Sequence, residues 1–444
     1  MRFAVLLASL ALAATAMPGL AQSQPSTPAA AARALDPAAV VAEVRRVINE
    51  RYVLPERRPV LDAVLAEGLA SGRYGVTDGA ILAERINADL ERVGQDRHLS
   101  FRLDPRTAAV IANGSGDAPG DGAAFERLVR QANHGITELR VLPGNVRLMN
   151  YEGFHWIGAE SAAALDTAMR FLAGGDAVII DLRENGGGNP EAVQYIISRF
   201  LPADTPLVTF YMNGEAEPDG FSALATPPEQ QMFGKPLYVL TSDGTGSAAE
   251  EFTGHVAGYH LGQIAGANTS GAGFRNDIVV VDDQFVFSVS VGRAVLASTG
   301  KDWEGVGFAP TLEAEVPGAL DIAHAAALRT LIATAPAEER PGLEAVAEAM
   351  EARGNRRAPE FALATYAGVY GERTLTSDGV RLFTRRGGRP PIPLIPLGGH
   401  RFAVETEPGM RMVFEATGRS VAAMTVDYAG GPAQPRVERT APAR

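Results

Sequence analysis

Hydrophobic residues recur at helical spacing in the first part of the chain. One stripe contains Val40, Val41, Val44, Val47 and Ile48, and a second contains Ile81, Leu82, Ile86, Leu90 and Val93. This spacing places apolar side chains along one face of a helix. We therefore expect a helical N-terminal subdomain over residues 38–104. It ends in "RHLSFRL", whose alternation is typical of a strand.

From about residue 136 the pattern changes to strands alternating with helices. "DAVIIDLR" and "PLYVLTS" are continuous apolar runs, as in strands buried on both faces. "AESAAALDTAMRFLAG" and "SAAEEFTGHVAGYHLG" have helical spacing. Such alternation predicts parallel βαβ units and hence an α/β core over residues 105–335. Within it, the turn-rich "ANGSGDAPGDGA" predicts a surface loop.

The last quarter of the chain has a third pattern. A helix and a Pro/Arg-rich linker over residues 336–358 precede short alternating stretches separated by "SDG", "RGG", "EPG" and "TG". Alternating runs separated by such turns are typical of β-hairpins. Residues 359–440 are therefore predicted to form a small all-β domain.

The N-terminus has the features of an export signal. Arg2 is followed by an apolar stretch to about Met17, and small residues precede a cleavage position after about Ala21. The stretch is shorter than the ~20 residues that a membrane span needs. We expect residues 1–21 to be a cleaved signal peptide and 22–37 a disordered lead-in. The mature protein would be periplasmic or secreted, with no integral membrane segment.

Composition excludes several classes of function. The 444 residues carry a net charge of −12, which disfavours nucleic acid as the main partner. The absence of cysteine excludes disulfides, a thiol nucleophile and cysteine-ligated metals. Because no His/Asp/Glu cluster has the spacing of metal ligands, we expect neither a metal nor a cofactor.

Ser247 lies between the apolar run "LYVL" and a predicted helix, within "SDGTGSAAEEF". It can be a simple helix cap, since Glu250 three residues later completes a capping box. The turn "DLRENGGGN", residues 181–189, follows another buried strand and should lie at the same sheet edge. Two such turns could supply backbone donors for an oxyanion. Asp181 and Arg183 are expected to fix the turn.

A nucleophilic serine needs a base, and the sequence offers few. His255 lies on the helix that Ser247 begins, ~12 Å along its axis and out of reach. His98 follows Asp96 at a helix-to-strand junction and is the better candidate. Downstream of Ser247 the first lysine is Lys301, because Ala272 occupies the turn "TSGAGF". A Ser/Lys dyad using that turn is therefore not available.

The blocks "GNVRLMNYEGF", "AVIIDLRENGGGN", "LYVLTSDGTGSAAEEF", "GANTSGAGF" and "WEGVGFAP" occur in an order that resembles the tail-specific peptidase superfamily. The branch it resembles is typified by tricorn protease and the interphotoreceptor retinoid-binding protein modules. The resemblance covers roughly residues 38–330 and implies a crotonase-like ββα core. It also implies Ser247 as nucleophile, His98 as general base, Glu304 as the orienting carboxylate, and the backbone N–H groups of Gly187 and Ala248 as oxyanion donors.

Two departures from that family stand out. Ala272 replaces the lysine of the processing-peptidase branch, and residues 104–140 are too few for the binding-groove domain that many members carry. Two hypotheses follow. One is a serine peptidase acting on peptides or unfolded polypeptide tails through an acyl-enzyme. The other is a non-catalytic module that binds an apolar ligand or peptide.

Overall fold

The computed structural model describes residues 34–94, 96–112, 121–215, 217–432 and 434–440. The predicted signal peptide, most of the lead-in and most of the predicted loop after residue 112 lie outside these residues. No helix within the described ranges is long and apolar enough to cross a membrane.

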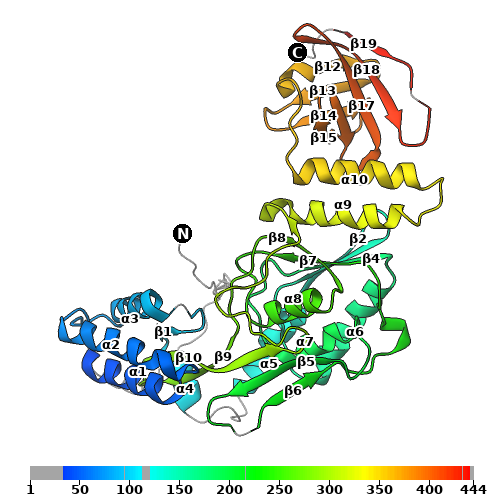
Figure 1. Ribbon diagram of the computed structural model, residues 1–444. Coiled ribbons are helices and arrows are strands. Elements are labelled where there is room, and N and C mark those ends of the chain that lie inside the picture. The colour runs from blue at the N-terminus through cyan, green and yellow to red at the C-terminus, as the bar shows by residue number, and fades with distance from the viewer. Residues whose placement is uncertain (1–33, 95, 113–120, 216, 433, 441–444) are drawn as a thin grey trace, which may run out of the picture. The chain divides into compact units, whose positions relative to one another are not determined.

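Three helices form the N-terminal part (Figure 1): α1 (Pro37–Arg51), α2 (Arg58–Ala70) and α3 (Gly79–Gly94). The first predicted stripe is buried throughout, and α3 buries Leu82, Ile86 and Leu90. Ile81 is an exception, with 41% of its surface exposed. Two further helices, α4 (Pro105–Ala112) and α5 (Asp121–Gln131), follow.

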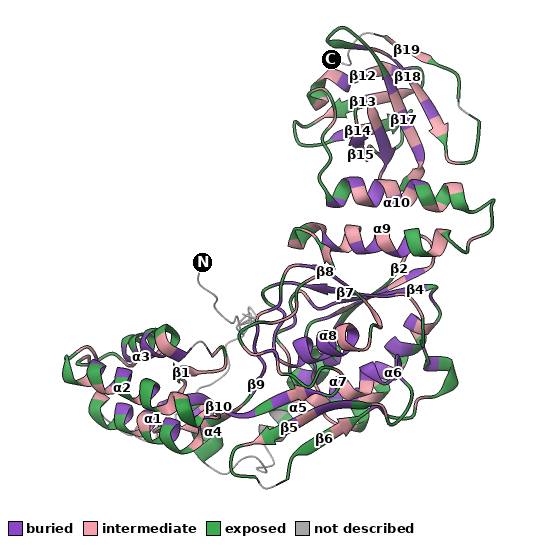
Figure 2. Cartoon of the chain, in the orientation of Figure 1, coloured by how far each residue is buried: buried purple, intermediate pink, exposed green. Residues whose placement is uncertain are grey.

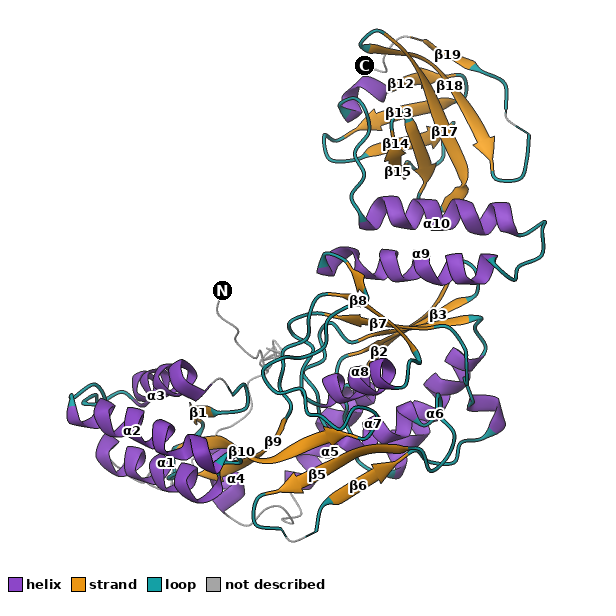
Figure 3. Ribbon diagram, in the orientation of Figure 1, coloured by secondary structure: helices purple, strands orange, loops and turns teal. Residues whose placement is uncertain are grey.

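An antiparallel sheet that the sequence did not predict continues from the helices into the core. Its strands are β1 (Ser100–Leu103), β5 (Pro206–Met212), β6 (Asp219–Ser222), β9 (Phe274–Val280) and β10 (Phe285–Leu296). The long β10 pairs with β1, β5 and β9. Strand β10 thereby connects the segment that carries His98 to the α/β core (Figure 3).

The core is a six-stranded sheet with the order β11-β8-β7-β4-β3-β2. These strands are β2 (Ile136–Leu142), β3 (Val146–Tyr151), β4 (Ala177–Asp181), β7 (Leu237–Thr241), β8 (Gly262–Gly266) and β11 (Leu312–Glu313). All neighbours are parallel except β2 and β3, which form an antiparallel pair. The predicted parallel α/β core is confirmed.

Helices cover both faces of this sheet, which explains its continuous apolar strands. Val178 and Ile180 of β4 pack in one cluster with α6 (Ala159–Ala173), α7 (Pro190–Ile197) and α8 (Ala248–Gly258). Ala177 and Ile179 pack on the opposite face with α9 (Ala319–Ile332). Strands β4 and β7 are therefore buried along their whole length (Figure 2).

The C-terminal strands form a closed antiparallel barrel in which β12 pairs with β19. Its strands are β12 (Gly368–Tyr370), β13 (Arg373–Ser377), β14 (Leu382–Arg386), β15 (Ile392–Gly398), β16 (Arg401–Val404), β17 (Glu407–Thr417), β18 (Ser420–Tyr428) and β19 (Val437–Thr440). Helix α10 (Arg340–Gly354) packs Ala349 and Met350 against Ile395 and Leu397 of the barrel.

Candidate active site

Ser247 occupies a sharp turn between β7 and α8. Its backbone angles are φ 52° and ψ −121°, a conformation that residues other than glycine rarely adopt. Such backbone strain persists only where surrounding contacts impose it, and it concentrates at functional sites. A strained strand–turn–helix serine is also the local geometry of nucleophile elbows. The Ser247 N–H donates to Glu250 Oε2 at 3.1 Å, as the capping interpretation predicted.

The turn after β4 lies directly against Ser247. Gly187 has φ +112°, and a Cβ there would meet Ser247 Cβ at 2.7 Å and Ala248 N at 3.0 Å. Only glycine fits so close an approach of two turns. The Gly246 N–H donates to the Asn185 carbonyl at 3.1 Å, which joins the turns. The predicted meeting of the two turns at one sheet edge is confirmed.

The backbone donors beside Ser247 differ in how they are engaged. The Gly187 N–H donates to Asn185 Oδ1 at 2.9 Å, so this conformation does not present it to a ligand. Within the described ranges, no group accepts from the N–H of Ala248 or of Gly188. Ala248 and Gly188 both line the cavity that contains Ser247. Their N–H groups are thus available to an anion at this position.

Asp181 and Arg183 hold the turn, as expected from the sequence. Their side chains form a two-pronged ion pair, with Arg183 Nη2 2.6 Å and Nε 2.9 Å from the Asp181 carboxylate. Arg183 Nη1 also donates to the Val316 carbonyl at 2.7 Å. None of these hydrogen bonds involves Ser247, so the ion pair has a structural role in the turn.

The buried carboxylate of Glu250 accepts hydrogen bonds from five donors. Besides the Ser247 N–H, it accepts from the Gly271 and Ala272 N–H groups, both at 2.7 Å, and from two hydroxyls. The hydroxyls belong to Thr269 at 2.6 Å and Ser270 at 3.1 Å. Glu250 therefore does more than cap α8, because it fixes the turn 269–272 against the nucleophile.

Glu304 holds the next part of the same turn. Its Oε2 accepts from the N–H groups of Gly273 at 2.6 Å and Phe274 at 2.9 Å. Its Oε1 is buried and has no partner among the described residues. Burial, followed by the nearby charge of Asp96, raises the pKa of Glu304 to about 8. The carboxyl group is thus largely protonated at neutral pH.

His98 lies in a cluster with Glu304 and Asp96. Ligand atoms of the three side chains lie within 4.8 Å of one another. His98 Nδ1 is buried without a hydrogen-bond partner in the described structure. Burial lowers the pKa of His98, against the opposing charges of Asp96 and Glu250. The ring is neutral at pH 7 and can accept a proton.

The same three side chains are the group that could hold a metal ion in the described part of the chain. Sequence spacing did not indicate such a cluster, because Glu304 lies about two hundred positions from the other two. One imidazole and two carboxylates suit a divalent cation. A metal there would occupy the atoms that the predicted general base uses.

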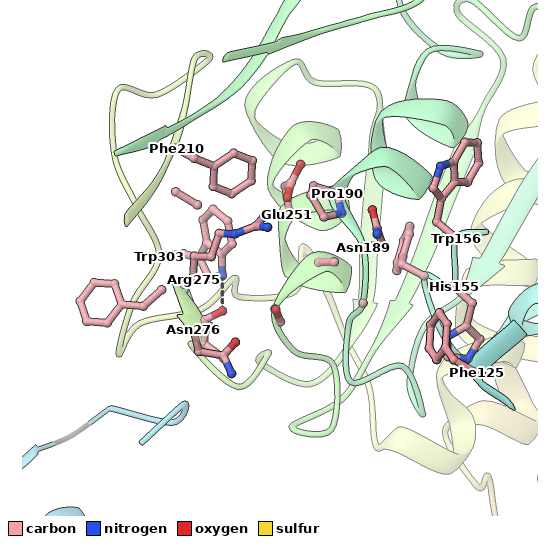
Figure 4. A pocket seen from close by; sticks show the side chains of 18 residues that line it. Phe125, His155, Trp156, Asn189, Pro190, Phe210, Glu251, Arg275, Asn276 and Trp303 are labelled. Atoms are coloured by element: carbon pink, nitrogen blue, oxygen red, sulfur yellow. Dashed lines mark hydrogen bonds between the residues drawn. The ribbon is translucent and has the colours of Figure 1, made fainter. Parts of the chain in front are cut away.

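A cavity of about 370 Å³ contains Ser247 and runs between two groups of aromatic side chains (Figure 4). Phe210 and Trp303 lie toward one end with Arg275 and Asn276, and Phe125, His155 and Trp156 lie toward the other. Asn189, Pro190 and Glu251 are drawn between them. A cavity that combines aromatic side chains with convergent polar groups is typical of ligand-binding sites.

The structure brings the predicted site residues together in two groups. Ser247, Gly187 and Ala248 form one group, and His98 and Glu304 form the other. No hydrogen bond between Ser247 Oγ and His98 is found in the described residues. The sequence pattern did not reveal that Asp96 lies beside His98 and Glu304 or that Arg275 lines the cavity. For Asp96 its position two residues before His98 was a usable signal, whereas nothing local singles out Arg275.

Comparisons with known proteins identify the family to which this chain is similar. Residues 144–314 match Peptidase family S41, and residues 32–133 match the N-terminal domain of Peptidase S41 in eukaryotic IRBP. A carboxyl-terminal-processing protease of Synechocystis sp. is 28% identical over 120 residues, covering 27% of each protein. The chloroplastic C-terminal processing peptidase of Tetradesmus obliquus is 26% identical over 212 residues, covering 48% of this chain and 40% of that protein.

The chain therefore spans less than half the length of these curated relatives. Among solved structures, the photosystem II D1 C-terminal processing protease has a TM-score of 0.41 at 17% identity, covering 64% of this chain and 94% of that one. Tricorn protease has a TM-score of 0.38 at 11% identity, covering 62% and 34%. With the S41 domain and its N-terminal domain together matching more than half of its length, the chain belongs to peptidase family S41.

Proposed function

We propose that this protein is a serine peptidase that cleaves peptides or unfolded polypeptide tails through an acyl-enzyme on Ser247. The observation that supports this most is the strained turn at Ser247. It lies in an aromatic cavity with the N–H of Ala248 beside it and without a partner in the described structure. A cavity-lining hydroxyl next to unengaged backbone donors is the arrangement that acyl transfer requires.

In the proposed reaction, Ser247 Oγ attacks the scissile carbonyl carbon while His98 takes its proton. The oxyanion that forms accepts from Ala248 and from the glycine turn. For Gly187 to serve there, its N–H must leave Asn185 Oδ1, whereas the N–H of Gly188 needs no such change. The C–N bond then breaks, the amine takes the proton from His98, and water releases the acyl group.

Glu304 would orient His98 and stabilise the imidazolium. The relay requires Ser247 and the His98 ring to come into hydrogen-bond contact on substrate binding. Catalytic hydrogen bonds are often long in unliganded enzymes and tighten in the complex. The export signal predicted at residues 1–21 would place this activity in the periplasm or outside the cell, with cleavage after about Ala21.

A fluorophosphonate probe tests the nucleophile directly. We expect labelling of the wild type, none of Ser247→Ala, and loss of peptide hydrolysis in the variant. Both proteins should unfold at similar urea concentrations. Equal labelling of both proteins would exclude Ser247 as the nucleophile.

The second function, binding of an apolar ligand without catalysis, is favoured by the aromatic lining of the cavity. Ligand binding by a wild type that the probe does not label would support it.

A further inference from the structure

Arg275 is a cation in the Ser247 cavity whose guanidinium has no hydrogen-bonded counter-ion among the described residues. It lies on β9, lines the cavity, and stacks its guanidinium 5.3 Å from the centre of the Phe210 ring. In the part of the chain that the structure describes, no side chain or carbonyl accepts a hydrogen bond from it or forms an ion pair with it. Arginine normally satisfies its five donors with carboxylates or carbonyls when they are within reach.

Three polar side chains of the cavity each have one atom engaged in a hydrogen bond. Asn276 Nδ2 donates to Ser288 Oγ at 2.7 Å, and Asn189 Oδ1 accepts from the Glu191 N–H at 3.0 Å. Trp303 Nε1 donates to the Ala272 carbonyl at 3.2 Å. The Arg275 guanidinium is thus a charged group of the cavity whose donors have no partner among the described residues.

Glu251 is the acidic side chain lining the same cavity, and the charge of Arg275 acts on it, but the two form no hydrogen bond or ion pair. Glu251 is 4% exposed, and burial raises its pKa, which favours the uncharged form. Its ion-pair partner is His255, whose Nε2 lies 3.5 Å from Glu251 Oε1. The end of the cavity formed by Phe210 and Trp303 is therefore cationic, while no charged side chain among the described residues lines the end formed by Phe125 and Trp156 (Figure 4).

We propose that Arg275 binds a carboxylate of the peptide in this cavity and so selects the substrates that Ser247 cleaves. The carboxylate can be an Asp or Glu side chain near the scissile bond, or the C-terminal carboxylate of a chain cleaved close to its end. This inference rests on the proposed peptidase function. Guanidinium and carboxylate groups match in geometry and can form two parallel hydrogen bonds. Phe210 beneath the guanidinium holds it in place for this contact.

Matched peptide pairs test the proposal and separate the two sources. One pair differs by Glu or Gln at an internal position, and the other by a free acid or an amide at the C-terminus. For the pair that matters, we expect kcat/KM to favour the carboxylate about 10-fold, as for a partly desolvated charge pair. Arg275→Gln should remove this preference, so that the two peptides of the pair are cleaved with equal kcat/KM. Arg275→Lys should retain part of it.

Arg381→Gln is the matched control. Arg381 also lies over an aromatic ring, 6.0 Å from the centre of Phe383, but in the barrel. The Arg381→Gln substitution removes the same charge as Arg275→Gln but leaves the Ser247 cavity unchanged, so the carboxylate preference should persist. A preference that is absent in the wild type for both pairs, or that survives in Arg275→Gln, would overturn the proposal.

Binding to Ser247→Ala separates this inference from the peptidase function. The chain has two tryptophans, Trp156 and Trp303, and both line the cavity. Their fluorescence reports peptide binding without turnover. The carboxylate peptide should bind Ser247→Ala more tightly than its neutral partner, and Ser247→Ala with Arg275→Gln should bind both equally. If both binding results are obtained but the wild type hydrolyses no peptide, the peptidase function is refuted and the carboxylate site is supported. Equal binding of both peptides by Ser247→Ala would refute the site.

Discussion

Glu250 and Glu304 accept hydrogen bonds from four successive backbone N–H groups of one turn. Glu250 binds those of Gly271 and Ala272, and Glu304 binds those of Gly273 and Phe274. Glu250 also binds the N–H of Ser247, while Glu304 lies beside His98. The predicted nucleophile and the predicted base are therefore tied to opposite ends of the same short segment.

Glu250→Gln should lower the free energy of unfolding by about 2–4 kcal/mol. The new amide nitrogen is itself a donor, and it would face backbone N–H groups and hydroxyls that now donate to a charged oxygen. The midpoint of urea unfolding measures the loss. Labelling of Ser247 should fall as well, since the turn and the nucleophile share this carboxylate. Glu344→Gln is the control, as Glu344 is exposed on α10. Equal stability of the two variants would contradict the role given to Glu250.

Gly187→Ala should reduce both stability and acylation of Ser247. The new Cβ would lie 2.7 Å from Ser247 Cβ, and φ +112° is unfavourable for alanine. Because the clash would displace Ser247 and the Ala248 N–H, we expect kcat to fall about 100-fold, the scale for the loss of one oxyanion donor. Gly186→Ala is a matched control, because its Cβ would meet nothing within 4 Å. Normal burst-phase acylation by Gly187→Ala would show that the close approach is dispensable.

Activity should rise with pH in two steps. His98 must lose its proton, and burial places that step below the ordinary histidine pKa of about 6.5. Glu304 must then ionise, with a pKa of about 8, before it can stabilise the imidazolium. His98 alone would predict a single rise near ~6–7. The activity deficit of Glu304→Gln should therefore grow from pH 6.5 to pH 9, toward the 10²–10⁴-fold range expected for such a relay. A deficit that is constant with pH would argue against this ionisation.

Stability should change in the opposite sense over the same range. The folded-state pKa of Glu304 lies above the ordinary value of 4.5, so the folded protein holds a proton that the unfolded chain releases. This contribution is fully present below pH 4.5 and is lost as the pH rises through about 8. The wild type should lose up to about 1.4 kcal/mol per pH unit relative to Glu304→Gln between pH 6.5 and 8. Parallel stability curves for the two proteins would contradict it.

Removing the barrel should destabilise α9 and α10. Ala325, Ala349 and Met350 share a buried cluster with Ile395 and Leu397, so a chain ending at Arg353 would expose apolar surface. We predict that this truncated chain binds more of a hydrophobic dye and melts several degrees lower than the full chain. If the truncated chain matches the full chain in dye binding and melting temperature, the barrel is separable without loss of stability.

Local patterns predicted most elements of the core, because β4 and β7 are covered on both faces and their apolar runs cannot be mistaken for loops. The antiparallel sheet around β10 was missed, since its order depends on pairing between segments far apart in the chain. At the site, Ser247 and the glycine turn were visible as turns after buried strands. The contact of Glu304 with Asp96 and the free donors of Arg275 depend on tertiary packing, which spacing does not encode.

The backbone of Ser247 also bears on how the chain can change. At φ 52° and ψ −121°, glycine would relieve strain that serine must bear. Position 247 is therefore one where the thermodynamically preferred residue and the chemically useful residue differ. A lineage released from any need for the hydroxyl would gain stability by giving it up. Replacement of Ser247 by glycine would then increase folding stability, and only selection for the serine hydroxyl would oppose it.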